Sequence, residues 1–158
     1  MNKAVLGIGS NMGSRRENLS AAVQAVEQLP ETTVLAASSI YETKPVEVAG
    51  AQNDYLNECI VIITDLSPHA LLGACLGIEA AMGRTREEHH GPRTVDIDLL
   101  IYEGAVIREP ELTLPHPGIL RRAFVLVPLG EIFPGGTALG LDFSAALKRA
   151  DTSGVHLF

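Results

Sequence analysis

The fold of this chain is decided by the stretch Gly91–Tyr102, which reads Gly-Pro-Arg-Thr-Val-Asp-Ile-Asp-Leu-Leu-Ile-Tyr. From Val95 onward the residues alternate as they do in a β-strand, where successive side chains point to opposite faces. One face is predicted to carry Val95, Ile97, Leu99 and Ile101. Asp96 and Asp98 share the other face, which becomes apolar again at Leu100. The pattern therefore predicts a central strand that is covered on both sides.

The two carboxylates at the start of this strand indicate a cation site. Asp96 and Asp98 would repel each other if they converged without a partner, and one of them would take up a proton. Mg²⁺ removes this conflict, because it needs only one or two carboxylates together with phosphate oxygens and waters. Arg93 adds a guanidinium, whose planar fork suits phosphate oxygens. The span favours a metal-bound polyphosphate, whereas the structural alternative is a solvated Asp-x-Asp pair.

The segments around this strand predict an α+β fold in a single domain that spans residues 1–158. Strands are expected at residues 5–10, 32–41, 54–64 and 95–101, and helices at 14–29, at 67–83 and after 118. A short tail helix is expected at 143–150. The first six elements follow the ferredoxin-like βαββαβ order, with a C-terminal extension. We therefore expect a mainly antiparallel four-stranded sheet with two helices on one face.

A glycine-rich stretch begins within the first predicted strand, continues into the turn after it, and contains Gly7, Gly9 and Gly13. Ser14 and Glu17 are expected to form a capping box at the start of the next helix. Such a turn can hold a phosphate, but glycines also occur where another backbone or a ligand comes close. An oxidoreductase that binds a mononucleotide or dinucleotide is one alternative. It would need more strand–helix units than this chain can hold.

The composition argues against nucleic-acid binders and membrane proteins. The net charge is −7 at pH 7, and no apolar run approaches the ~20 residues of a membrane helix. Residues Met1–Leu6 lead straight into a strand and have no signal-peptide pattern. Cys59 and Cys75 are expected to be buried apolar residues, not a disulfide or a metal pair. We therefore expect a cytoplasmic monomer.

Taken together, the motifs resemble those of the hydroxymethyl-dihydropterin pyrophosphokinases of the folate pathway. The stretch Gly91–Tyr102 resembles the signature of that family. Further blocks resemble the family in the same order, namely Gly7–Asn11, Tyr41–Val46, Tyr55–Asn57, Leu114–Pro117 and Arg122–Leu129. Several separated motifs in the right order are far more specific than any one of them.

The resemblance implies an activity and its cofactors. Pyrophosphate would pass from ATP, the co-substrate, to the hydroxyl of 6-hydroxymethyl-7,8-dihydropterin, giving the pterin diphosphate and AMP. Two Mg²⁺ ions would be held by Asp96 and Asp98, between ATP and the pterin. The chain contains no obvious strong base for the substrate alcohol, so we expect metal-assisted activation that is helped by Asp96.

The resemblance also implies roles for further site residues. Arg84 and Arg93 would act with the two aspartates in catalysis and neutralise the phosphates. The implied ATP-binding residues are Glu79, Arg93, Thr113, His116 and Arg122. The implied pterin pocket consists of Thr43, Val46, Tyr55, Asn57 and Phe124, with the rings of Tyr55 and Phe124 sandwiching the pterin.

A second alternative is a non-catalytic ferredoxin-like module that binds a ligand. Such a module would have no use for Asp96, Asp98 and Arg93 together. Nucleotide binding with and without Mg²⁺ separates the two hypotheses, because strict metal dependence argues against a simple binding module.

Overall fold

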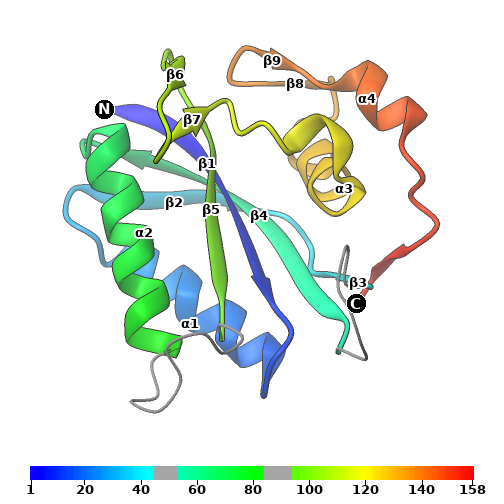
Figure 1. Cartoon of the computed structure of the whole chain (residues 1–158), viewed down its shortest axis with the longest axis horizontal. Coiled ribbons are helices and arrows are strands. Elements are labelled where there is room, and N and C mark those ends of the chain that lie inside the picture. Colours follow the sequence, from blue (N-terminus) through cyan, green and yellow to red (C-terminus); the bar gives the residue numbers. More distant parts are fainter. Residues whose placement is uncertain (45–52, 84–93) are drawn as a thin grey trace.

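The computed structural model describes residues 1–44, 53–83 and 94–158, and places a six-stranded antiparallel sheet at the centre of an α+β fold (Figure 1). Five strands follow one another across the sheet in the order β10 (Val155–Leu157), β3 (Tyr41–Thr43), β4 (Tyr55–Thr64), β1 (Asn2–Ser10) and β5 (Asp96–Tyr102). The sixth strand, β2 (Thr32–Ala37), also pairs with β4, on the same edge as β3 but nearer the end of β4.

Helices cover both faces of this sheet (Figure 1). One face carries α1 (Arg15–Glu27) and α2 (Pro68–Gly83). The other carries α3 (Ala123–Ile132), α4 (Ser144–Arg149) and the short 3-10 helix η1 (Ile119–Arg121). Two small hairpins complete the described part of the chain, β6 (Ile107–Arg108) with β7 (Thr113–Leu114) and β8 (Thr137–Ala138) with β9 (Leu141–Asp142).

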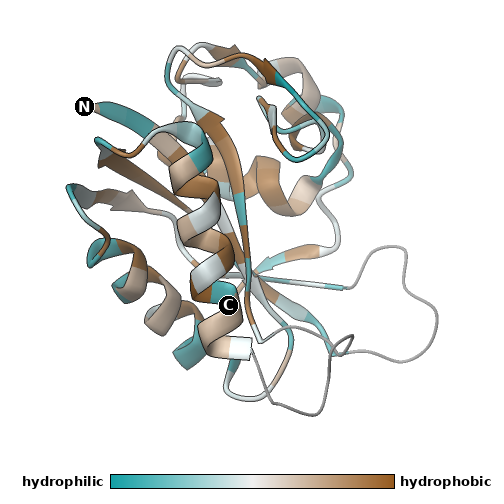
Figure 2. Ribbon diagram, turned by 60° about the vertical axis from the view of Figure 1, so that its left-hand side comes forward, coloured by the Kyte–Doolittle hydropathy of each residue, from teal (hydrophilic) through white to brown (hydrophobic). Residues whose placement is uncertain are grey.

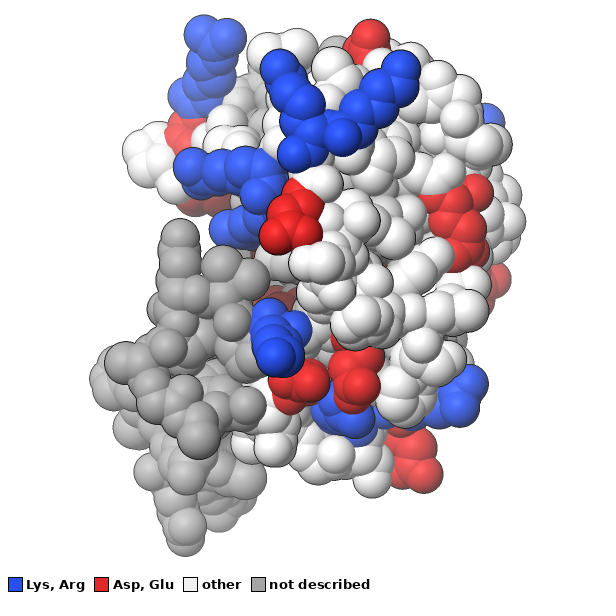
Figure 3. All heavy atoms as spheres, turned by 90° about the vertical axis from the view of Figure 1, so that its right-hand side faces the viewer, with Lys and Arg blue, Asp and Glu red and all other residues white. Residues whose placement is uncertain are grey.

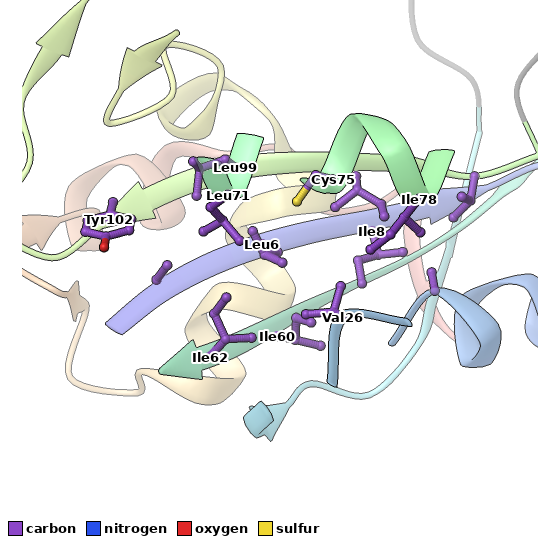
Figure 4. Close-up of a cluster of buried hydrophobic side chains, with 14 of the residues drawn as sticks. Leu6, Ile8, Val26, Ile60, Ile62, Leu71, Cys75, Ile78, Leu99 and Tyr102 are labelled. Atoms are coloured by element: carbon purple, nitrogen blue, oxygen red, sulfur yellow. The ribbon is translucent and has the colours of Figure 1, made fainter. Parts of the chain in front are cut away.

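Two hydrophobic clusters hold the three layers together. The cluster under α1 and α2 includes Leu6, Ile8, Ile60 and Leu71, which point into the space between sheet and helices (Figure 4). The cluster under α3 and α4 is centred on the fully buried Phe143. Hydrophobic residues run along the strands and through α3 (Figure 2). Because these side chains avoid water, both faces of the sheet are covered. The two clusters belong to opposite faces of the same strands.

The carboxylate of Glu58 is buried within this framework. Glu58 lies opposite Ile8 in the pairing of β1 with β4 and exposes only 7% of its surface. Burial raises the pKa of Glu58 to about 7, because the charged form loses its hydration.

The strand that carries the aspartates is β5, and it differs from the prediction in its place in the sheet. It lies at the edge and not at the centre, since β1 is its partner in the sheet. Its apolar run reflects helices on both faces, which burial patterns alone do not distinguish from a central position. At this edge the carboxylate of Glu79 on α2 accepts a hydrogen bond of 2.7 Å from the backbone N–H of Ile97.

A β-bulge also changes the facing of the end of β5. Val5 pairs with Ile101 and Leu6 pairs with Leu99, so Leu100 has no opposite residue on β1. The extra residue rotates the remainder of the strand, and Ile101 joins the cluster under α3 instead of sharing the face of Leu99. The predicted grouping of four apolar residues on one face therefore fails at its last member.

Three further predictions are corrected by the structure. Within the described residues the sheet has six strands and not four, because β3 and β10 extend it. The predicted strand at 32–41 is two strands, since the N–H of Ser38 bonds to the carbonyl of Cys59 and its hydroxyl accepts the N–H of Cys59. The predicted capping box is not formed, because the side chain of the N-cap residue Ser14 makes no capping hydrogen bond.

Both cysteines are free and buried, as predicted. Burial raises the pKa of Cys59 and of Cys75 to about 12 in each case, helped by the nearby carboxylates of Glu58 and Glu79 respectively. Of the helices that the structure describes, none has the length and apolar character needed to cross a membrane.

Candidate active site

A cavity of about 570 Å³ lies on the α3 side of the sheet, within the size range of small-molecule sites. Its lining comes from segments far apart in the sequence, namely Gly7–Gly9, Thr43–Lys44, Tyr55, Asn57–Cys59, Glu79, Asp96, Asp98, Leu100, His116, Arg121–Arg122 and Phe124–Val125. The face that carries α3 and the C-terminus shows Lys and Arg side chains grouped beside acidic ones (Figure 3). The cavity therefore joins negative and positive side chains with aromatic ones.

The carboxylates enter the cavity from the edge strand. Asp96 pairs with Gly9 and Asp98 pairs with Gly7, so both side chains lie over a stretch of β1 that has little side-chain bulk. Both aspartates are half-buried. Glu79 adds a third carboxylate to the lining, and it is 7% exposed. Two adjacent carboxylates on one wall are oxygen donors of the type that Mg²⁺ prefers.

A hydrogen-bonded pair forms the polar wall opposite. The side-chain amide of Asn57 donates to the hydroxyl of Thr43 over 2.7 Å, and both residues are buried. A Cβ atom at Gly9 would lie 2.8 Å from Oδ1 of Asn57, so glycine is what leaves room for this amide. Such a fixed pair can recognise the polar edge of a flat ligand, because its remaining donor and acceptor have set positions.

Two aromatic side chains border the same cavity. Burial raises the pKa of Tyr55, and the nearby charge of Asp96 raises it further, which ties the aromatic side of the cavity to the carboxylate side. Phe124 lies at the start of α3, with the guanidinium carbon of Arg122 5.8 Å from its ring centroid. Both rings are partly buried and line the cavity.

His116 is set as a neutral hydrogen-bond donor. Its Nδ1 accepts the backbone N–H of Gly118 over 3.0 Å, which leaves Nε2 to carry the proton in the neutral ring. Burial lowers the pKa of His116, and Arg122 and Arg121 lower it further, while Asp98 acts in the opposite direction. The lowered pKa favours the neutral imidazole, which can donate from Nε2.

Arg122, which directly follows η1, is placed by a close approach to the backbone. A Cβ atom at Gly118 would lie only 2.7 Å from the guanidinium carbon of Arg122. Gly118 thus allows the Arg122 side chain to fold back over the loop and reach the cavity. Arg121 and Lys44 also line the cavity, so three cationic side chains face it among the described residues.

The structure brings most of the predicted site residues together. Those around the cavity are Thr43, Tyr55, Asn57, Glu79, Asp96, Asp98, His116, Arg122 and Phe124. Thr113 does not line the cavity, and its hydroxyl donates to the carbonyl of Glu109 over 3.3 Å. Val46, Arg84 and Arg93 lie outside the described residues.

Sequence reasoning did not assign roles to Lys44, Arg121, Leu100 or Val125, which also line the cavity. Two of them could have been found from the sequence, because each is next to a predicted site residue: Lys44 follows Thr43, and Arg121 precedes Arg122. For Leu100 the alternation was the signal, since it places Leu100 on the same face of β5 as Asp96 and Asp98.

Comparison with known proteins decides the family. Residues 5–134 match the family of 7,8-dihydro-6-hydroxymethylpterin-pyrophosphokinase. The chain belongs to this family. A relative from Methylorubrum extorquens, named 2-amino-4-hydroxy-6-hydroxymethyldihydropteridine pyrophosphokinase, is 45% identical over 156 residues, which cover 99% of this chain and 98% of the relative. A relative of the same name from Bacillus subtilis is 44% identical over 157 residues, which cover 99% of this chain and 90% of the relative.

Solved structures support the fold of a pyrophosphokinase of this family. The Plasmodium falciparum protein HPPK-DHPS superposes with a TM-score of 0.69 at 16% identity, over 94% of this chain. This chain spans less than half of that larger protein, at 43% of its length. The family resemblance inferred from the sequence motifs is thus confirmed, as is the α+β class.

Proposed function

We infer that the cavity is the active site of this pyrophosphokinase, which transfers the pyrophosphoryl group of ATP to the hydroxyl of hydroxymethyldihydropterin in folate biosynthesis. One observation carries the assignment of the site. The Asp96 and Asp98 carboxylates share a single cavity with the Thr43–Asn57 pair. This arrangement puts a place for charged phosphates beside a place for a flat polar ring.

The pterin half of the site is proposed to lie between the aromatic side chains. Tyr55 and Phe124 would sandwich the ring, and Asn57 and Thr43 would bond to its polar edge. Their burial supports this role, since hydrogen bonds that exclude water discriminate strongly between ligands. Val46 is proposed as a further contact from outside the described residues.

The phosphate half is proposed to lie at the cationic side. Arg122 and His116 would bond to the triphosphate of ATP, and the neutral Nε2–H of His116 can donate without adding charge. Arg84 and Arg93, from outside the described residues, would neutralise phosphate charge there. Glu79 and Thr113 are proposed to help seat the nucleotide, Glu79 from within the cavity lining.

Asp96 and Asp98 are the residues proposed to hold two Mg²⁺ ions. When bound, these ions would neutralise the phosphates and favour ionisation of the pterin hydroxyl. The two half-buried carboxylates lie on the same face of β5, two residues apart. They suit Mg²⁺, because hard cations select oxygen donors. Asp96 also lies close enough to Tyr55 to influence its pKa, so the proposed ion site and pterin site adjoin.

The proposed reaction is one displacement at phosphorus. The pterin hydroxyl releases its proton, which Asp96 is proposed to help remove, and its oxygen forms a bond to the β-phosphorus of ATP. The bond from that phosphorus to the α–β bridging oxygen breaks, and AMP leaves with the electron pair. The chain's own residues position the two substrates in line and exclude water, which is the main protein contribution to phosphoryl transfer.

The test is a product assay with purified protein, ATP, Mg²⁺ and hydroxymethyldihydropterin. We expect AMP and the pterin diphosphate in equal amounts, and no turnover when Mg²⁺ is replaced by a chelator. ADP with a pterin monophosphate would contradict attack on the β-phosphorus, because these products form when the γ-phosphorus is attacked. Products that form equally well without Mg²⁺ would contradict the metal requirement.

We further propose that the chain is a cytoplasmic monomer and that residues 1–158 form one domain with a ferredoxin-like core. The strand order β5, β1, β4, β2 and the position of α1 and α2 on one face support that core. Sedimentation equilibrium tests the monomer, with a mass near 16.8 kDa expected.

A further inference from the structure

Arg15 stands at the first position of α1 and connects two strands that meet beside the cavity. Its guanidinium nitrogen Nη1 lies 2.7 Å from Oε2 of Glu42 in an ion pair, and the same nitrogen donates to the carbonyl of Asp54 over 2.9 Å. The ion pair is partly shielded from water, since the two side chains are 25% and 35% exposed. One side chain therefore binds both strands.

The two partners of Arg15 directly precede two residues of the proposed pterin pocket. Glu42 precedes Thr43 on β3, and Asp54 precedes Tyr55 at the start of β4. Thr43 and Tyr55 lie opposite each other in the antiparallel pairing. Any shift of Glu42 or Asp54 is thus transmitted through a single peptide unit to a residue that lines the cavity.

The C-terminus covers this connection from outside. The ring centroid of Phe158 lies 5.7 Å from the guanidinium carbon of Arg15, and the N–H of Phe158 donates to the carbonyl of Ile40 over 2.9 Å. The preceding strand β10 pairs with β3, with Val155 opposite Thr43. The guanidinium is therefore held among α1, β3, β4 and the last residue of the chain.

We propose that Arg15 is a positioning residue for the pterin half of the active site, an inference that rests on the proposed function. Arg15 is not part of the cavity lining, and Glu42 points to the face of β3 opposite that of Thr43. It acts through these neighbours: the guanidinium sets the distance between β3 and β4 at the mouth of the cavity, and hence that between Thr43 and Tyr55. An arginine suits this role, because a single guanidinium nitrogen carries two N–H groups that can bond to a carboxylate and a carbonyl together.

The adjacent Arg16 offers a matched control. It lies in the same helical turn, loses the same charge on substitution, and its guanidinium carbon is also 5.7 Å from the Phe158 ring. Its side chain is exposed, and it does not line the cavity. The comparison of Arg15→Met with Arg16→Met therefore isolates the bonds to Glu42 and Asp54 from the general effect of charge.

Steady-state kinetics give the first measurement. We expect Arg15→Met to raise the KM for the pterin about tenfold, in line with the loss of a charge-assisted hydrogen bond, and to leave the KM for ATP unchanged. Arg15→Lys, which keeps the charge, should recover part of the loss, and Arg16→Met should match the wild type. A rise in both KM values together with a lower Tm would show general destabilisation and overturn the proposal.

Backbone amide resonances of the ligand-free protein give a second measurement, which does not depend on activity. Arg15→Met should shift the amide signals of Thr43 and Tyr55, and Arg16→Met should leave them in place. If wild-type protein made no pterin diphosphate, the proposed function would fail. The amide shifts would still decide whether Arg15 fixes the distance between β3 and β4. Amide signals unchanged in Arg15→Met would overturn the positioning role even in an active enzyme.

Discussion

Single side chains in the cavity owe their orientation to neighbours that hold or make room for them. The side chain of Asn57 donates a hydrogen bond to the hydroxyl of Thr43, and Gly9, which has no side chain, leaves room for it. His116 is held by the N–H of Gly118. These contacts fix donors and acceptors before any ligand arrives, which lowers the free-energy cost of ordering them on binding.

The first prediction at this scale concerns the aspartates. Asp96→Asn and Asp98→Asn should each lose most activity, because each removes a proposed ion ligand, while the fold survives. Loss of the repulsion between two adjacent carboxylates should leave the Tm unchanged or slightly raised. Turnover at saturating Mg²⁺ and thermal melts check both parts, with the exposed Glu17→Gln as control. Wild-type turnover in either variant would remove the metal role.

The second concerns Glu58, whose pKa burial raises to about 7 from an unfolded value near 4.5. Between these two values the folded chain holds a proton that the unfolded chain has released, so stability falls as the pH rises from 4.5 through 7. The difference corresponds to about 3 kcal/mol in the free energy of unfolding.

Glu58→Gln should remove this dependence. At pH 8 the variant should be more stable than the wild type, and near pH 4.5 the two should be equal, as judged by urea unfolding at each pH. Parallel stability curves for the two proteins across this range would show that the Glu58 carboxylate does not titrate as described.

At the scale of elements, the junction between η1 and α3 controls the cationic side of the site. Gly118 has φ −84° and ψ −12°, which alanine also adopts, so its replacement tests only the space that the missing Cβ leaves. Gly118→Ala would bring a Cβ to 2.7 Å from the guanidinium carbon of Arg122. We expect Arg122 to move, the KM for ATP to rise severalfold, and the Tm to stay constant.

The control for this variant is Gly73→Ala, in an exposed position of α2 with open space around the added Cβ. It should stabilise the chain by about 0.5–1 kcal/mol, because glycine is a poor residue inside a helix, and it should leave both KM values alone. An unchanged KM for ATP in Gly118→Ala would show that the position of Arg122 is unimportant for the nucleotide.

The end of α3 is tied to the start of β3 through Glu131. Its carboxylate accepts hydrogen bonds from the N–H of Ser39 over 2.7 Å and from the hydroxyl of Tyr41 over 2.5 Å. The hydrogen bond to Glu131 raises the pKa of Tyr41 to about 12, with burial and the negative charge adding to it. α3 is thereby linked at its far end to the strand that carries Thr43.

Glu131→Gln should lower the pKa of Tyr41 towards the ordinary value near 10, because the negative acceptor is gone. The chain has three tyrosines and no tryptophan, so the phenolate absorbance can be followed directly during a pH titration. Tyr41→Phe identifies the step that belongs to Tyr41. If that step occurs at the same pH in Glu131→Gln, the hydrogen bond is not what controls it.

Sequence patterns predicted the long elements well and the connections between sheet strands poorly. Alternation and helical spacing identified β4, β5 and α2, because each is long enough for its period to be visible. They could not show that β5 lies at an edge or that Leu100 is a bulge, since both depend on pairing with β1. Strand β10 was missed because its three residues are too short for a pattern.

The same division applies to the site. The family motifs named nine residues that meet around one cavity, and the alternation on β5 placed both aspartates on one face. What the residue order could not give is the contribution of backbone proximity, such as Gly118 beneath Arg122 and Gly9 beside Asn57. These contacts join positions that are distant in the sequence or that follow an irregular turn.

At the scale of the whole molecule, the C-terminal extension is part of the structural core. Phe143 is fully buried in the cluster that also contains Val5, Val61 and Leu126. The extension therefore packs against strands from the first half of the chain. We expect residues 1–158 to unfold as one cooperative unit.

Phe143→Ala tests this expectation, since it should lower the free energy of unfolding by about 3–5 kcal/mol through the cavity it leaves. Calorimetry should show one transition in both proteins, with the whole transition moved to lower temperature in the variant. A separate low-temperature transition, with the rest of the chain unaffected, would instead reveal an independently folding tail.

Because both cysteines are buried, the folded protein offers thiol reagents no accessible cysteine. Cys59 and Cys75 are at most 1% exposed, and their raised pKa values keep them protonated at neutral pH, whereas the thiolate is the reactive form. A cysteine introduced at an exposed site such as Leu120, within η1, would then be the attachment point for a fluorophore or spin label, without removal of either native thiol. Wild-type protein should react with a maleimide only after unfolding. The rate at which the wild type is labelled would therefore measure how often the native chain opens.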